Sequence, residues 1–79
     1  MSHQVKIYST SSCVYCVKAK DFFKNNNVEY QEFNVSTDAS AREEMINTSG
    51  QMAVPVIDID GKIIVGFDES AIKRALEID

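Results

Sequence analysis

The chain has 79 residues, 44% of them hydrophobic, and its 12 acidic and 8 basic residues give a formal charge of -4. This length fits one domain over residues 1–79, and the negative charge argues against nucleic-acid binding, because phosphate recognition needs a clustered positive field. No apolar run approaches the roughly 20 residues that span a bilayer, and the N-terminus has no apolar stretch of leader length. We therefore expect a cytoplasmic protein with no membrane partner.

The first segments predict a strand, a polar loop and a helix. Residues 5–8 alternate between apolar and polar side chains, as a short strand does, and residues 9–12 form a small polar loop. A helical pattern then runs over residues 14–26 and ends in asparagines, which tolerate the left-handed conformation. Four residues share the apolar face of this helix: Cys16, Ala19, Phe22 and Phe23.

The next segments predict a second strand and a second helix. Residues 28–35 are strand-like, but the apolar residues of the two halves are out of phase, so we expect a bend or bulge between them. Thr37 and Asp38 are N-cap candidates for a helix over residues 39–48, which Gly50 ends.

The last third of the chain predicts a hairpin and a third helix. A strand over residues 54–59 is entered through Pro55, and an Asp-Gly turn at residues 60–61 leads into a strand over residues 62–65. Asp68 then caps the last helix. The resulting order, βαβαββα, predicts an α/β protein with a four-stranded mixed sheet flanked by three helices. The helical crossover makes the first two strands parallel, and the tight turn makes the last two antiparallel.

The chemistry is expected at Cys13 and Cys16, which lie where the first strand gives way to the first helix. The free amides and the dipole at a helix N-terminus stabilise a thiolate, so we expect Cys13 to be ionised at neutral pH. Cys16 lies nearly one turn further along the same face and is less exposed. We therefore predict that Cys13 is a nucleophile and that Cys16 resolves a mixed disulfide formed at Cys13.

Metal binding by the same two cysteines is the main alternative. A structural zinc ion takes four ligands, and the chain adds only His3, which we expect in a frayed terminus. Small copper-carrying domains also place C-x-x-C after a first strand, but their elements run βαββαβ and a methionine precedes the pair. Two inert buried cysteines are disfavoured, because Cys13 falls in a polar loop. We expect no metal.

Three motifs in order resemble those of glutaredoxins: C-V-Y-C at residues 13–16, A-V-P at residues 53–55 and V-G-F-D at residues 65–68. The chain is similar in particular to short bacterial glutaredoxin-like proteins, and residues 50–57 are the most telling stretch. This resemblance covers nearly the whole chain. It implies a thioredoxin-like fold with a cis Val54–Pro55 bond, and thiol-disulfide oxidoreductase activity with glutathione as co-substrate.

The same resemblance implies a glutathione site. Tyr15 flanks the thiols, and the backbone of Val54, beside Pro55, pairs with the cysteine part of glutathione. Three residues are expected to hold the γ-glutamyl end: Gly66, Phe67 and Asp68. Free amides at the start of the last helix suit a carboxylate there.

The chain departs from the family pattern at several positions. Val14 replaces the proline of C-P-Y-C, Ala53 replaces a threonine, and Val65 replaces the first of two glycines. Thr10 stands where many glutaredoxins have a lysine for the glycyl carboxylate of glutathione, and Gln51 is a candidate substitute. We expect weak glutathione affinity for this reason.

Other side chains and functions complete the expectations. Lys18, Lys20 and the Arg42–Glu44 stretch are interpreted as solvated helix residues. A dithiol carrier reduced by a thioredoxin reductase, serving a client such as ribonucleotide reductase, is an alternative function. An iron–sulfur cluster held through Cys13 and glutathione, or copper binding, represents a different class. The expected partners of a monomeric protein are glutathione and disulfide-bonded or glutathionylated proteins.

Overall fold

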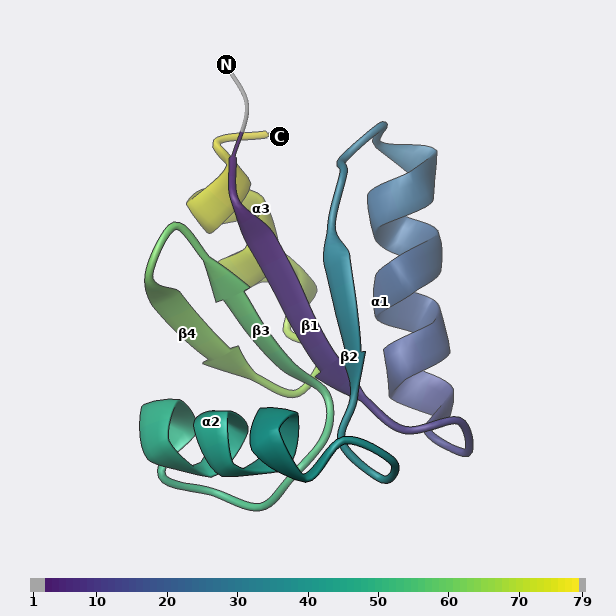
Figure 1. Ribbon diagram of the computed structural model, residues 1–79. Helices are drawn as coiled ribbons and strands as arrows, with labels where there is room; N and C mark the ends of the chain where they lie inside the picture. The colour runs from purple at the N-terminus through teal and green to yellow at the C-terminus, as the bar shows by residue number, and fades with distance from the viewer. Residues whose placement is uncertain (1–2, 79) are drawn as a thin grey trace.

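The computed structural model describes residues 3–78 and shows seven elements (Figure 1). These are β1 (Val5–Ser9), α1 (Val14–Asn25), β2 (Gln31–Asn34), α2 (Ala39–Ser49), β3 (Val56–Ile59), β4 (Lys62–Val65) and α3 (Glu69–Leu76). The predicted order βαβαββα is confirmed. The expectation of one domain over residues 1–79 stays a prediction, because the two ends of the chain lie outside the described range.

The four strands form one mixed sheet in the order β2-β1-β3-β4. β1 and β2 are parallel, whereas β1 and β3, and β3 and β4, are antiparallel, as the connections predicted. The two central strands are therefore β1 and β3. No helix within residues 3–78 has the length and apolarity to cross a membrane.

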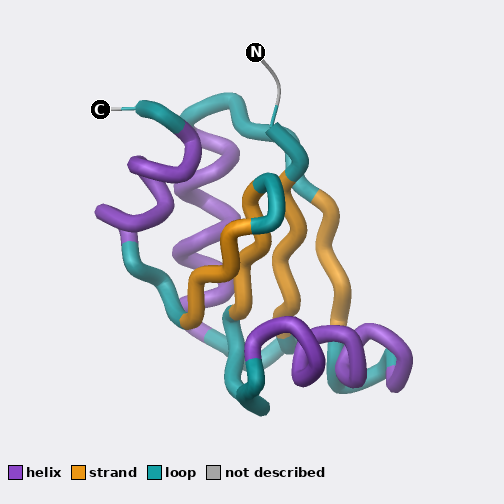
Figure 2. The backbone as a smooth tube through the Cα atoms, turned by 90° about the vertical axis from the view of Figure 1, so that its left-hand side faces the viewer, coloured by secondary structure: helices purple, strands orange, loops and turns teal. Residues whose placement is uncertain are grey.

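Helices cover both faces of the sheet, α1 and α3 on one side and α2 on the other (Figure 2). Neighbouring residues of β1 show this division, because Ile7 packs in the cluster with α1 and α3 and Tyr8 packs in the cluster with α2. Successive side chains of a strand point to opposite faces, so a sheet covered twice buries both. The larger cluster contains Val5, Ile7, Ala19, Phe23, Ile57, Ile59, Ile72, Ala75 and Leu76.

The second strand is shorter than predicted, and the predicted bend or bulge is wrong. The register between β1 and β2 is unbroken. Val28 and Tyr30 pack against the cluster of α1 and α3, while Phe33 and Val35 pack in the cluster of α2. The two apolar phases are therefore two faces of one segment, each covered by a different layer of helices.

Caps and turns set the other boundaries close to the predicted ones. Asp38, rather than Thr37, caps α2, and its Oδ1 accepts a hydrogen bond from the Ala41 amide at 3.1 Å. Gly50 ends this helix with a φ of 71°, in the left-handed region that glycine adopts without steric cost. The peptide bond between Val54 and Pro55 is cis, as the resemblance implied, and the strand begins at Val56.

The burial of the central strand predicts a large stability difference between two paired isoleucines. Ile57 is fully buried in β3, and its register partner Ile64 lies half-buried in the edge strand β4. We expect Ile57→Ala to lower the free energy of unfolding by about 2–5 kcal/mol, and Ile64→Ala by clearly less, because less apolar surface and a smaller cavity are involved. Urea unfolding followed by circular dichroism measures both losses. Equal losses would contradict the assignment of Ile57 to the core.

Candidate active site

Strand register brings three loops to one edge of the sheet. β1 ends where β3 begins, since Tyr8 pairs with Val56, and β3 begins where β4 ends, since Val56 pairs with Val65. The loop after β1, which carries Cys13, therefore leaves the sheet at the same edge as the segments before β3 and after β4 (Figure 1). The three motifs that are far apart in sequence meet here.

Cys13 is the N-cap residue of α1. Its backbone is extended, with φ -90° and ψ 112°, and its Sγ accepts a hydrogen bond from the Cys16 amide at 3.2 Å. The Thr10 carbonyl accepts from the Cys13 amide at 3.4 Å and ties the loop to the helix start. The first turn of α1 contains no acidic residue. A donated amide and the positive end of the helix dipole both favour negative charge on this sulfur.

Cys16 lies in a different environment one turn further along α1. Its side chain is 0% exposed, whereas Cys13 is partly exposed, and both are free thiols. Burial and the neighbouring Cys13 raise the pKa of Cys16 to about 12, although the Thr10 backbone and the charge of Lys20 oppose that rise. Cys16 is therefore a protonated thiol at neutral pH. The ionised state of Cys13 and the two catalytic roles stay predictions.

A surface pocket of about 370 Å³ lies at the edge where the loops meet. Its lining residues are Tyr15, Val54, Pro55, Val65, Gly66, Phe67 and Asp68. Of the seven residues expected to bind glutathione, only Gln51 is missing from this lining. The structure thus brings together residues from α1, from the segment before β3 and from the start of α3.

The start of α3 forms one end of this pocket. The Oδ1 of Asp68 caps the helix by accepting a hydrogen bond from the Ala71 amide at 3.2 Å. The amides of Glu69 and Ser70 come before that of Ala71, in the first turn of the helix, where amides have no intrahelical partner. The Gly66 amide donates to the Pro55 carbonyl at 2.8 Å, which fixes the loop against the cis proline. This end offers both a carboxylate and free amides.

Phe67 both packs against α1 and lines the pocket. Its ring packs edge-on against Phe22 of α1, with 6.1 Å between ring centroids and 65° between planes. It also lines the pocket. The aromatic contact therefore holds the loop before α3 against α1 while part of the ring faces the pocket.

A second pocket of about 250 Å³ shares Val54 with the first. Its lining residues are Thr10, Val35, Ser36, Arg42, Met45, Met52, Ala53 and Val54. Arg42 is exposed on α2, as the sequence predicted, and it also lines this pocket, a role that the sequence did not indicate although its helical spacing from Met45 gave a signal. Gln51 lies outside both linings, with its amide bonded to the Ser49 hydroxyl at 3.2 Å, and its glutathione role stays a prediction.

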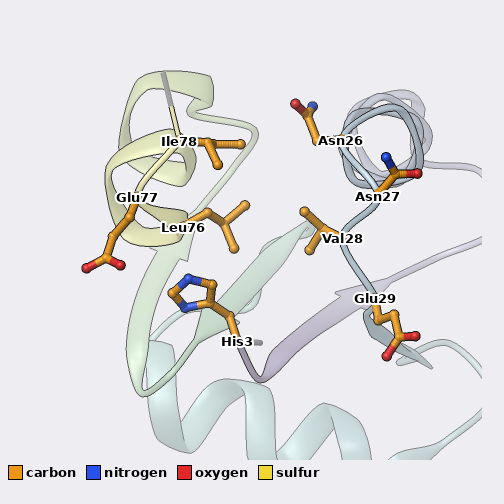
Figure 3. Close-up of a pocket in the computed structure, with 8 residues that line it drawn as sticks. All are labelled: His3, Asn26, Asn27, Val28, Glu29, Leu76, Glu77 and Ile78. Atoms are coloured by element: carbon orange, nitrogen blue, oxygen red, sulfur yellow. The ribbon is translucent and has the colours of Figure 1, made fainter. Parts of the chain in front are cut away.

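A larger pocket of about 600 Å³ lies at the other end of α1, away from the cysteines (Figure 3). Its lining includes Val28, Leu76 and Ile78 together with His3. His3 is not frayed as expected, because its Nδ1 contacts the carboxylate of Asp60. Within residues 3–78 no three His, Cys, Asp or Glu side chains are grouped to hold a metal ion. This pocket contains no group suited to thiol chemistry.

Known proteins are similar to this chain in sequence and in fold. Residues 5–64 match the family model described as Glutaredoxin. A glutaredoxin-like 8.6 kDa protein in the rubredoxin operon of Clostridium pasteurianum is 47% identical over 73 residues, which cover 92% of this chain and 97% of that protein. Glutaredoxin 3 of Escherichia coli is 42% identical over 65 residues, 82% of this chain and 78% of that protein.

Solved structures confirm the expected thioredoxin-like fold. The crystal structure of the thioredoxin-like protein BC3987 superimposes with a TM-score of 0.86 and 33% sequence identity. The match covers 91% of this chain and 99% of that one.

The difference in exposure predicts selective alkylation. We expect iodoacetamide to modify Cys13 of the reduced native protein at neutral pH and to leave Cys16 unmodified, because Cys16 is a buried thiol with a pKa of about 12. Peptide mass spectrometry after brief labelling locates the modified residue. The Cys16→Ser variant should react as fast as the parent. Faster labelling of Cys16 than of Cys13 would refute the assigned environments.

Proposed function

The chain belongs to the glutaredoxin family of thiol-disulfide oxidoreductases, and from that premise we propose that it reduces protein disulfides and glutathione mixed disulfides with glutathione as co-substrate. In this proposal Cys13 is the nucleophile and Cys16 the resolving thiol. The main support is the pairing of a partly exposed Cys13 at a helix N-terminus with a buried Cys16 one turn away. We further propose a monomer working in the cytoplasm, where thiols are kept reduced.

The proposed reaction begins with attack of the Cys13 thiolate on a substrate disulfide. A new bond forms between Cys13 and one substrate sulfur, and the other sulfur leaves as a thiolate that takes up a proton. With a glutathionylated protein, the protein thiol leaves and glutathione stays on Cys13. A second glutathione thiolate then attacks the bound glutathione sulfur, so that oxidised glutathione leaves and Cys13 is again a thiolate.

A protein disulfide follows the other branch. Cys16 loses its proton and attacks the Cys13 sulfur of the mixed disulfide, which releases the second substrate thiol. The dithiol has then given two electrons to the substrate and has become a Cys13–Cys16 disulfide. Two glutathione molecules return it to the dithiol and leave as oxidised glutathione.

The two pockets that meet at Val54 have charges complementary to those of glutathione. Asp68 can accept from the γ-glutamyl ammonium group, and the free amides at the start of α3 suit the adjoining carboxylate. Arg42 lines the second pocket and supplies a positive charge for the glycyl carboxylate at the other end. This charge compensates for Thr10, which stands in the same pocket where many glutaredoxins have a lysine.

Exposed apolar side chains favour a protein client as well. Val14 and Val17 are exposed in the first turn of α1, and Met52 is 73% exposed beside the second pocket. Such a surface next to a reactive thiol suits docking of a folded or extended protein. It also supports the second candidate function, a dithiol carrier reduced by a thioredoxin reductase. Comparing turnover with glutathione plus glutathione reductase against thioredoxin reductase separates the two reductants.

Single cysteine variants test the two branches. We expect Cys16→Ser to keep substantial activity on glutathionylated substrates, because glutathione resolves that intermediate. It should lose about tenfold or more on protein disulfides, because the intramolecular attack is absent. Cys13→Ser should be inactive on both. Initial rates with a glutathione mixed disulfide and with a protein disulfide measure the split, and an equal loss of both activities in Cys16→Ser would contradict the proposed roles.

Charge removal tests the proposed glycyl end of the site. Arg42→Met should raise the KM for a glutathione mixed disulfide by about threefold to tenfold with little change in kcat, because an ion pair to bound substrate is lost. Arg74→Met, which removes the same charge from the last turn of α3, is the matched control and should leave KM unchanged. Gln51→Ala tests the substitute expected from sequence. A larger effect from Gln51→Ala than from Arg42→Met would reverse the assignment.

A further inference from the structure

A charged cluster links α1 to the sheet, one helical turn from the buried Cys16. The Lys20 ammonium lies 2.8 Å from the Glu32 Oε2 of β2, and the hydroxyl of Ser9, at the end of β1, donates to the same oxygen at 3.0 Å. Ser9 is buried, and the Lys20 side chain is only 22% exposed. The interpretation of Lys20 as a solvated residue is therefore wrong.

The cluster anchors Lys20 on the face of α1 that carries Cys16. Lys20 follows Cys16 by four positions, so the two residues are neighbours one turn apart on the helix surface. Glu32 accepts from the ammonium group, and the Ser9 hydroxyl of the adjacent strand donates to the same carboxylate oxygen and so helps to fix Glu32 in place. Lys20 is a positive charge that acts on Cys16 and opposes the rise in the pKa of that thiol.

This arrangement answers a need of the resolving step. Cys16 is a fully buried thiol, and it must become a thiolate before it can attack the mixed disulfide at Cys13. Burial disfavours the charged sulfur, and a nearby positive charge offsets part of that cost. The Cys13 sulfur itself is no longer negative once it is part of a mixed disulfide.

We propose that Lys20, anchored by Glu32 and Ser9, is a positioning residue that stabilises the Cys16 thiolate during resolution. The inference rests on the proposed resolving role of Cys16 and adds the group that makes this role possible. In the step, the Cys16 proton passes to solvent, the Cys16 sulfur bonds to Cys13, and the leaving substrate thiolate takes up a proton. The charge of Lys20 is unchanged throughout.

Other charged and titratable groups near Cys16 and Lys20 also shift the pKa values in this cluster. Cys13 opposes ionisation of Cys16 while it is itself a thiolate. Glu32 and Tyr30, which precedes β2, both raise the pKa of Lys20. Glu32 has the larger effect because it accepts the hydrogen bond. Lys24, one turn further along α1, lowers the pKa of Glu32. Lys20 is the one side chain in this group whose charge favours the Cys16 thiolate.

Stopped-flow reaction of the reduced full chain with excess dithiobis(nitrobenzoate) isolates the step. The first release of coloured thiolate reports attack by Cys13 and depends on reagent concentration. The second release reports attack by Cys16 on the mixed disulfide and does not depend on reagent concentration. The pH dependence of the second rate reports the ionisation of Cys16. If Lys20 had only a structural role, its removal would not change this pH dependence.

We expect Lys20→Met to slow the second release by about threefold to tenfold at neutral pH and to move its rise to higher pH. The first release should not change. Lys20→Arg keeps the charge and the partner Glu32 and should restore the parent rate. Lys24→Met, which removes one exposed charge from the same helix, is the matched control and should behave as the parent.

Different results would overturn the role of Lys20 and the resolving role of Cys16. A second release equal to that of the parent in Lys20→Met at every pH would overturn the role of Lys20. Equal slowing in Lys20→Met and Lys24→Met would also overturn it, because the effect would then be one of net charge. Absence of any second release in the parent itself would instead overturn the resolving role of Cys16.

Discussion

The hydrogen bond from the Cys16 amide to the Cys13 sulfur is the contact on which the site depends. It places the sulfur where a serine or aspartate usually caps a helix, so the atom that caps α1 is also the proposed nucleophile. A cap accepts hydrogen bonds, and a thiolate accepts them better than a thiol does. The hydrogen bond that caps α1 and the proposed chemistry therefore involve the same sulfur.

The mixed sheet decides which groups surround that sulfur. Because β3 is antiparallel to both β1 and β4, the end of β1, the start of β3 and the end of β4 lie in one row. The cis bond just before β3 and the start of α3, which comes after β4, therefore lie near this row. A different strand order would leave the same motifs in the sequence and scatter them over the surface.

Sequence patterns predicted the order of elements, the cap at Asp68 and the turn after β3, because each is set by neighbouring residues. The pocket residues came from the family resemblance, since no local rule brings Tyr15 to Asp68. Periodicity failed in the second strand, because it does not tell how many faces of a sheet are covered. It also failed for Lys20, whose ion pair with Glu32 depends on another element, and it did not place the exposed Arg42 at a pocket. The sequence shows that a helix residue is charged, but the tertiary structure decides which residue it contacts.

The two described ends of the chain meet far from the chemistry. His3 and Ile78 line the same pocket, which lies at the C-terminal end of α1 (Figure 3). Cys13 caps the N-terminal end of the same helix. The 12 residues of α1 separate them by about 18 Å. A fluorophore, an immobilisation handle or a fused reporter attached near either end would therefore leave the approach of a bulky substrate to Cys13 unobstructed.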